Sequence, residues 1–349
     1  MNYFVYVKDI LGVRTNLDQF SWNYGTIAPK ASAEEFNKCK MKVNIEVRKS
    51  NDVFDYTIDK ENYDKYNYFF AKKNQRKIYY YRDFLFNSKL GFSIEIIDNC
   101  NINVVVSKNY YKYVKYRFMN IHSIGYILTD LVSGLLLVNG YCSIHCSAVR
   151  LNNKTLVIFA PSNTGKTLTA TRLCLQEGAE FITEDIAITD GENIYSAPWT
   201  STFSYYNQEK YSKFDKLVDI LQDKIMLLQL ILLRKKKSAE EFFGKNNILD
   251  SSKITDIVLL GKGQNQVVKN KEGMFESIIN LNKYEFNYHK SPSMLVFEYF
   301  NPDLSIEKMF NIEKTILNNL LNNTNGYRVY TNCPLDYTKL ITDKIIFSE

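Results

Sequence analysis

A stretch near the middle of the chain constrains its fold more than any other part of the sequence. It begins with an apolar run, Leu156–Phe159, continues through turn-forming residues that end in Gly165, Lys166 and Thr167, and closes with a helix-forming segment that stops before Gly178. A short apolar run bounded by turn residues is typical of a buried strand, and a glycine after a helical pattern favours a helix C-terminus. The sequence therefore predicts a strand, a tight loop and a capped helix in succession.

The loop between that strand and helix has the composition of a phosphate-binding loop. It matches the pattern GxxxxGK[ST] except that Ala160 replaces the first glycine. In such loops the backbone N–H groups and the helix N-terminus converge on phosphate oxygens, the lysine reaches the β and γ phosphates, and the hydroxyl binds Mg²⁺. We therefore predict ATP and Mg²⁺ as cofactors, against the alternative of an accidental turn. The predicted nucleotide-binding residues are Ser162, Asn163, Thr164, Gly165, Lys166 and Thr167.

The departure at Ala160 weakens the motif without voiding it. A methyl group costs most where the backbone needs positive φ, and a residue at a strand end can keep negative φ. Asn163 is the non-glycine residue type best suited to a left-handed turn. We therefore expect the loop to fold around an anion.

Two adjacent carboxylates follow the helix. The segment 179–183 reads as a short strand that ends in Glu184 and Asp185, and a second apolar run, Ile186–Ile188, comes directly after them. Beside a phosphate loop, one carboxylate can hold the metal and the other can accept a proton from an attacking hydroxyl. Because strand side chains alternate between faces, the two should not point at the same atom. The alternative is an acidic pair in a solvated turn; the predicted metal ligands are Thr167, Glu184 and Asp185, and the predicted catalytic residues on this argument are Lys166, Glu184 and Asp185.

A histidine precedes the loop by about twenty residues. His145 lies between Cys142 and Cys146 in a segment that reads as a strand. On a strand the two cysteines share a face and the histidine takes the other, so a structural metal site is the weaker alternative. A role for His145 as a phosphate contact rests mostly on the resemblance described below.

The residue pattern of the chain changes at about residue 110. We predict a mostly β N-terminal domain over 1–110 and an α/β domain of mixed sheet with helices over 111–349. In the first domain, the aromatic and basic segment Tyr63–Phe84 favours half-buried strands over a nucleic-acid stacking surface. Further predicted elements are a helix through Met119–Leu135 that ends at Asn139 and Gly140, strands at Tyr141–Leu151, Thr155–Phe159, Ile254–Leu260 and Tyr327–Tyr330, a turn at Asn152 and Asn153, an apolar core element at Ile225–Leu233, and a helix at Ser305–Leu321. The basic run Arg234–Lys237 is typical of a solvent-exposed end of a helix or loop. For Trp199 we predict a partly buried position in the core.

The order of these motifs resembles the HPr kinase-like and PEP carboxykinase-like P-loop group, which includes HPr serine kinases and the peptide kinases of lasso-peptide biosynthesis. The resemblance covers about residues 117–191 by motif, the remaining C-terminal part more loosely, and none of the first hundred residues. It implies a PEP carboxykinase-like catalytic domain and transfer of a γ-phosphoryl group to a hydroxyl, typically serine, of a peptide or protein. It also implies that His145 lies near the transferred phosphate and that Glu184 and Asp185 match a pair that is usually Asp-Asp. The glycine-rich acidic signature of true HPr kinase/phosphorylases is not found downstream, which argues against HPr as the substrate.

Composition limits the function classes. The chain has 349 residues with 45% hydrophobic and 23% charged residues, which excludes a disordered or fibrous protein. A net charge of +6 without a concentrated basic patch argues against a dedicated nucleic-acid binder, and we expect no membrane partner. Six irregularly spaced cysteines and a start, MNYFVYVKDI, without signal-peptide features predict a cytoplasmic protein. We therefore predict a kinase with a peptide or protein substrate, against the alternative of a nucleotide-binding regulatory protein without phosphotransfer, and leave open whether the protein forms a homo-oligomer.

Overall fold

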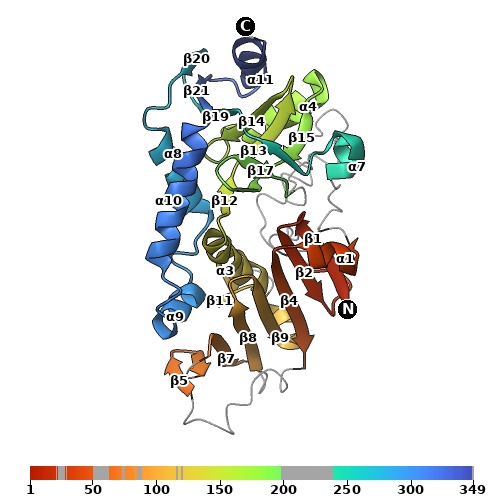
Figure 1. The fold of residues 1–349 in the computed structure, drawn as a ribbon, viewed down its shortest axis with the longest axis vertical. Coiled ribbons are helices and arrows are strands. Elements are labelled where there is room, and N and C mark those ends of the chain that lie inside the picture. Colours follow the sequence, from red (N-terminus) through yellow and green to blue (C-terminus); the bar gives the residue numbers. More distant parts are fainter. Residues whose placement is uncertain are drawn as a thin grey trace.

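The computed structural model describes residues 1–20, 22, 28, 30–49, 63–72, 75–84, 89–114, 117–118, 121–197 and 239–347. Within these ranges the chain is a mixed α/β protein with several sheets, as Figure 1 shows. The predicted core element at 225–233, the basic run 234–237 and Trp199 lie outside the described residues.

The first part of the chain is mostly β, as its alternating pattern predicts, and its strands form one nine-stranded sheet. In β4, for example, Met41, Val43 and Ile45 are buried while the residues between them are half-buried, which is the period of two that a strand imposes. The sheet order is β3-β1-β2-β4-β9-β8-β7-β6-β5, and the β2–β4 and β4–β9 pairs are parallel. The strands are β1 (Asn2–Val7), β2 (Leu11–Thr15), β3 (Lys30–Ala31), β4 (Met41–Arg48), β5 (Tyr63–Tyr66), β6 (Phe69–Lys72), β7 (Lys77–Asp83), β8 (Lys89–Asp98) and β9 (Asn101–Ser107).

A buried helix, α3 (Ile124–Val138), links this sheet to the rest of the chain. The predicted helix start near residue 119 is wrong, because Ser123 caps the helix by accepting a hydrogen bond from the Tyr126 N–H. The helix ends at Asn139, before Gly140 at φ 82°, as predicted. Its apolar residues belong to one core cluster together with residues of the nine-stranded sheet and of later helices. The described core is thus continuous across residue 110, and the proposed domain boundary there stays a prediction.

Two smaller sheets hold the strands that flank the phosphate-loop motif. A four-stranded sheet has the order β12-β16-β17-β18 and a six-stranded mixed sheet the order β15-β13-β14-β19-β21-β20, in which β14, β19 and β21 run parallel. The four-stranded sheet contains β12 (Cys142–His145), β16 (Ile186–Thr189), β17 (Asn193–Tyr195) and β18 (Ser251–Lys253). The six-stranded sheet contains β13 (Ser147–Leu151), β14 (Lys154–Phe159), β15 (Glu180–Thr183), β19 (Asp256–Gly261), β20 (Gln266–Lys269) and β21 (Asn325–Tyr330).

The predicted single strand over 141–151 is therefore two strands in different sheets. The chain leaves β12 at His145 and enters β13 at Ser147, so Cys146 is the crossing point. The predicted turn at Asn152 and Asn153 is present, with φ of 47° and 62°, which joins β13 to β14 in the left-handed conformation that asparagine tolerates. Short-range pattern located the turn, but the choice of sheet depends on pairing partners far along the chain.

Helices cover the sheets on several sides, with α8, α9 and α10 running along one side of the molecule in Figure 1. The predicted helix at 305–321 is α10, whose N-cap is Ser305. Besides α3, the helices are α1 (Ala33–Lys38), α2 (Lys108–Tyr113), α4 (Lys166–Glu177), α7 (Ala239–Phe243), α8 (Met274–Glu285), α9 (Pro292–Phe300), α10 (Ile306–Asn322) and α11 (Asp336–Ile341), with a 3₁₀ turn η6 (Lys245–Asn247), a π-helical turn η7 (Thr342–Ile346) and a two-stranded ribbon of β10 (Arg117–Phe118) and β11 (Ile121–His122). In the part of the chain that is described, no helix combines the length and apolarity that crossing a membrane requires.

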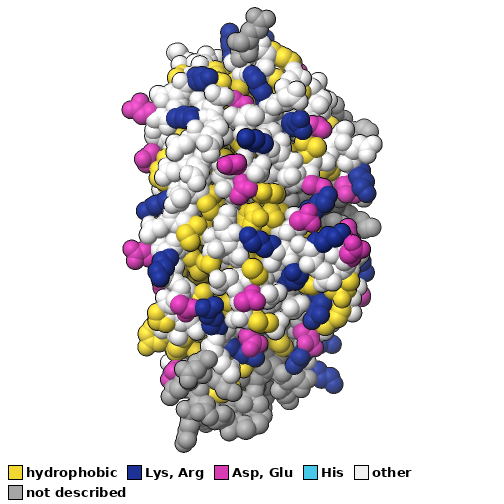
Figure 2. Space-filling model, in the orientation of Figure 1, with side chains coloured by type: hydrophobic (Ala, Val, Ile, Leu, Met, Phe, Trp, Pro, Cys, Tyr) yellow, Lys and Arg dark blue, Asp and Glu magenta, His cyan; other side chains and the backbone are white. Residues whose placement is uncertain are grey.

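The surface carries charges of both signs. On the face that Figure 2 shows, lysine and arginine side chains are interspersed with aspartate and glutamate, and apolar side chains gather near the middle of the face. The scattered charge expected from the composition is visible there.

A partly buried aspartate on α3, Asp130, makes stability pH-dependent. Burial raises the pKa of Asp130 from 3.8 to about 6, although hydrogen bonds from Ser291 and the Asn287 backbone oppose the rise. The folded state then holds this proton more tightly than the unfolded state, so this group stabilises the fold most at low pH and loses that contribution as pH rises from about 4 to about 6. We expect the free energy of unfolding of Asp130→Asn to rise relative to that of wild type by up to about 3 kcal/mol over that interval, at about 1.4 kcal/mol per pKa unit. Urea unfolding of both proteins at pH 4, 5, 6 and 7 measures this change. A difference in unfolding free energy that stays constant across these pH values would contradict the prediction.

Candidate functional site

The predicted phosphate loop connects β14 to α4 in the described structure. Asn163 has φ of 61° and Gly165 has φ of 117°, so two left-handed residues turn the chain, and the Thr164 N–H closes the turn on the Pro161 carbonyl at 3.3 Å. Gly165 caps α4 without a side-chain hydrogen bond, which leaves N–H groups of the first helical turn available to an anion. Ala160 is fully buried at the strand end and is not among the described residues with positive φ. Alanine is therefore accommodated there, as predicted.

Gly165 is the position in this loop where a side chain is least tolerable. A Cβ atom there would lie 3.1 Å from Pro334 Cβ and 3.5 Å from the Tyr337 ring, at a φ that L-residues rarely adopt. We expect Gly165→Ala to destabilise the protein by about 2 kcal/mol or more and to weaken nucleotide binding, because strain and crowding act together. The matched control is Gly178→Ala, at φ 74° with open space around the added Cβ, which should cost only about 1 kcal/mol. Urea unfolding and ATP titration measure both variants; equal behaviour of the two would contradict the expectation.

Two chain crossings place the histidine beside the acidic pair. The chain passes from the four-stranded to the six-stranded sheet after His145, and from the six-stranded back to the four-stranded sheet at Glu184 and Asp185. The strand register opposes His145 to Ile186 and Ala148 to Thr183. The two crossings must therefore be neighbours.

Lys166 and His145 form the buried centre of the site. Lys166 Nζ lies 2.9 Å from His145 Nε2, and the two residues are 7% and 6% exposed. Burial, and then the charge of Lys166, lowers the pKa of His145 to about 3, so the ring is neutral at pH 7. Nε2 therefore accepts a hydrogen bond from the Lys166 ammonium, and the ring proton is on Nδ1. That nitrogen faces Asp185 Oδ1 at 3.3 Å.

The adjacent carboxylates diverge, as predicted, but not through strand alternation, because both lie in the bend between β15 and β16. Glu184 is 2% exposed and accepts a hydrogen bond from the Thr167 hydroxyl. Asp185 has φ of 78°, and its half-exposed carboxylate lies 3.9 Å from Lys166 Nζ. Aspartate tolerates this left-handed conformation better than most residues, yet it still costs about 1 kcal/mol. Glu184 thus contacts the Thr167 hydroxyl. Asp185 lies beside Lys166 and His145.

A third carboxylate, Glu285, was missed by the sequence analysis. It ends α8, and its Oε1 atom lies 3.7 Å from His145 Nε2. Burial, and then the nearby charge of Asp185, raises the pKa of Glu285, while Lys166 opposes the rise. No local pattern marks this residue, because it reaches the site only through the packing of a helix that begins more than a hundred residues after Lys166.

The structure brings together most of the predicted site residues. Lys166, His145 and Asp185 form one set of contacts, and their chain neighbours Thr167 and Glu184 form a second. In the loop before them, Ser162 and Asn163 are exposed and Thr164 is buried.

The donor groups fit an anion and a hard cation. Free N–H groups at a helix start and a lysine suit phosphate oxygens, and hydroxyl and carboxylate oxygens are ligands that Mg²⁺ prefers. No group of three or more His, Cys, Asp and Glu side chains within the described ranges could by itself hold a metal ion.

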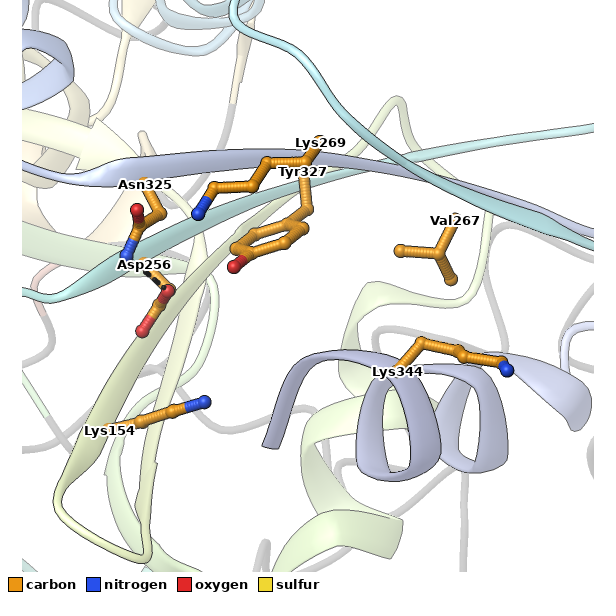
Figure 3. Close-up of a pocket in the computed structure, with 7 residues that line it drawn as sticks. All are labelled: Lys154, Asp256, Val267, Lys269, Asn325, Tyr327 and Lys344. Carbon is orange, nitrogen blue, oxygen red and sulfur yellow. Dashed lines mark hydrogen bonds between the residues drawn. The ribbon is translucent and has the colours of Figure 1, made fainter. Parts of the chain in front are cut away.

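A separate cavity lies at the opposite edge of the six-stranded sheet. It has a volume of about 500 Å³ and is bordered by Lys154, Asp256 and Asn325, the first residues of the parallel strands β14, β19 and β21. Figure 3 shows Lys154, Lys269 and the Tyr327 hydroxyl directed toward its interior, while Lys344 points away. Because the phosphate loop follows the last residue of β14, this cavity contains none of the predicted site residues.

Comparison with solved structures finds weak structural similarity. The solved structure of Hpr(Ser) kinase/phosphatase from Coxiella burnetii matches with a TM-score of 0.28 and 8% sequence identity, covering 58% of this chain and 96% of that one. No protein-family model matches the chain, and no curated protein matches it. The function proposed below is therefore argued from the sequence motifs and the geometry of the site.

Proposed function

We propose that this protein is an ATP-dependent phosphotransferase that moves the γ-phosphoryl group to a hydroxyl, typically serine, of a peptide or protein. The observation that carries the proposal is the contact set around Lys166. A lysine in the first turn of a helix that follows a left-handed loop lies 2.9 Å from His145 and 3.9 Å from Asp185. The order of motifs that resembles the HPr kinase-like group supports the same activity.

Each residue has a distinct role in this proposal. The N–H groups at the start of α4 and the Lys166 ammonium bind the phosphate oxygens. Thr167 and Glu184, already hydrogen-bonded to each other, would hold Mg²⁺. Asp185, the third predicted ligand, diverges from Glu184 toward His145 and Lys166 and is left for the acceptor. When bound, Mg²⁺ neutralises negative charge on the phosphates. The neutral His145 ring lies between Lys166 and Asp185, with one ring nitrogen toward each, and so keeps the two side chains aligned.

Asp185 accepts the proton of the acceptor hydroxyl. As the hydroxyl oxygen forms its bond to the γ-phosphorus, the bond from that phosphorus to ADP breaks and the hydroxyl proton passes to the carboxylate. The exposure of this side chain, 40%, leaves it accessible to a substrate hydroxyl. The same proposal places the protein in the cytoplasm, where six free thiols persist.

Radiolabelled ATP tests the proposal. The full-length protein is incubated with Mg²⁺, [γ-³²P]ATP and a panel of serine-containing peptides, and label on peptide and on the protein itself is counted. We expect label on a peptide or protein hydroxyl. ATP binding without transfer to any acceptor would favour the alternative, a nucleotide-responsive regulatory protein, and absence of ATP binding would overturn both.

A further inference from the structure

The strand that carries His145 is an edge strand within the described part of the chain. In the four-stranded sheet β12 pairs only with β16, through four residue pairs from Cys142 to His145. The outer backbone groups of an edge strand need other partners, because burying an unpaired N–H or C=O group costs about 1–3 kcal/mol. Ser143 and His145 are both buried.

A side chain of α8 supplies those partners. Asn282 Oδ1 accepts a hydrogen bond from the His145 N–H at 3.2 Å, and Asn282 Nδ2 donates to the Ser143 carbonyl at 2.9 Å. An amide group carries one acceptor and two donors, so it can bind the C=O of one residue and the N–H of the residue two positions on, as a neighbouring strand would. Asn282 therefore completes the outer edge of β12.

Asn282 is itself held by a buried polar network. Its Nδ2 group also donates to Glu313 Oε1 at 2.9 Å, and the Tyr288 hydroxyl donates to Glu313 Oε2 at 2.6 Å. Asn282, Tyr288 and Glu313 are each at most 3% exposed. A buried network whose members are hydrogen-bonded specifies one arrangement, since every alternative leaves a buried polar group unpaired. The hydrogen bonds that Asn282 and Tyr288 donate to Glu313 thus fix the position of the Asn282 amide.

The same helix also approaches the histidine ring. Glu285 lies three residues after Asn282, which places both side chains on one face of α8. Asn282 contacts the backbone of His145, and Glu285 Oε1 lies 3.7 Å from its ring. The location of His145 relative to Lys166 therefore depends on α8 as well as on its own sheet.

We propose that Asn282 is a positioning residue for phosphoryl transfer, which acts by fixing the backbone of His145 and so the alignment of Lys166 and Asp185. The inference rests on the proposed function. A displacement of about 1 Å in a catalytic group can cost about a hundredfold in rate. Partners that orient metal-binding side chains commonly contribute ten- to a hundredfold to activity, and we expect the same scale for a partner of His145.

The first test compares Asn282→Ala with Asn280→Ala, an exposed asparagine on the same helix. We expect Asn282→Ala to lower the transfer rate about ten- to a hundredfold with the apparent KM for ATP within about threefold of wild type. Asn280→Ala should behave as wild type. Should Asn282→Ala not fold, Asn282→Asp keeps the acceptor for the His145 N–H, removes the donors to Ser143 and Glu313, and is tested in the same way. A transfer rate for Asn282→Ala equal to that of Asn280→Ala overturns the proposal.

A double-mutant cycle with His145→Ala separates positioning from a merely structural role. If Asn282 acts through His145, its replacement should change the residual rate of His145→Ala by less than threefold, whereas independent effects multiply. A full ten- to a hundredfold further loss in that background overturns the proposal.

Hydrogen exchange at the His145 amide tests the contact independently of activity. We expect slow exchange in wild type and Asn280→Ala and at least tenfold faster exchange in Asn282→Ala; unchanged exchange overturns the proposal. A wild-type protein that binds ATP and transfers nothing overturns the proposed function and, with it, the role in transfer. The exchange measurement then still decides whether Asn282 fixes the His145 backbone.

Discussion

Replacing Lys166 with alanine is expected to lower the rate of phosphoryl transfer by a hundredfold or more and to weaken ATP binding. Lys166 is the cation at the start of α4, it is 7% exposed, and its ammonium contacts His145. A charge that is prearranged in a buried site stabilises developing negative charge far more than one in water, and removal of a single such group commonly costs a hundred- to a thousandfold. Transfer of label from [γ-³²P]ATP and ATP titration measure the two effects.

The matched control for this change is Lys269→Ala. Lys269 lines the separate cavity at the opposite edge of the same sheet and is exposed. We expect this variant to transfer and bind as wild type does, because the cavity shares no residue with the phosphate loop. Equal activity of Lys166→Ala and Lys269→Ala would contradict the role given to Lys166.

Asp185→Asn is expected to reduce transfer by about a hundred- to ten-thousandfold while ATP binding survives. General acid–base groups contribute on that order to rate, and an amide cannot take up the proton of the acceptor hydroxyl. The substitution suits the backbone, since Asp185 has φ of 78° and asparagine tolerates left-handed conformations at least as well as aspartate. A loss of transfer would therefore report chemistry rather than misfolding.

Asp343→Asn, at an exposed position on η7, serves as the control for Asp185→Asn. It should leave both transfer and binding unchanged. Full transfer by Asp185→Asn would assign the proton to another acceptor, with Glu285 the nearest unused carboxylate to His145. Loss of binding together with transfer would instead indicate that Asp185 serves the nucleotide and its metal.

Sequence reasoning located the features of this fold that depend on neighbouring residues. The strand before the loop, the left-handed Asn163, the helix cap at Gly178 and the turn at Asn152 are present in the structure. Each of these is decided by backbone preferences over a few residues, which a single sequence displays. The divergence of Glu184 and Asp185 was predicted for the wrong reason, since both residues lie in a bend between strands and not on a strand.

The features that sequence reasoning missed depend on distant partners. The strand predicted over 141–151 divides at Cys146 because β12 pairs with β16 while β13 pairs with β14 and β15. Glu285 and Asn282 reach His145 from a helix that contacts β12 only in the folded chain. Neither residue belongs to a motif, so only the tertiary packing reveals them.

The most direct measurement of the central claim follows the two ends of the nucleotide separately. The wild-type protein is given Mg²⁺ and a serine-containing acceptor with ATP labelled either at the γ or at the α phosphate, and the label on acceptor hydroxyls is counted. The site described here predicts label from the γ position alone, together with its loss in Lys166→Ala. Label from neither position in a protein that binds no ATP would contradict the account.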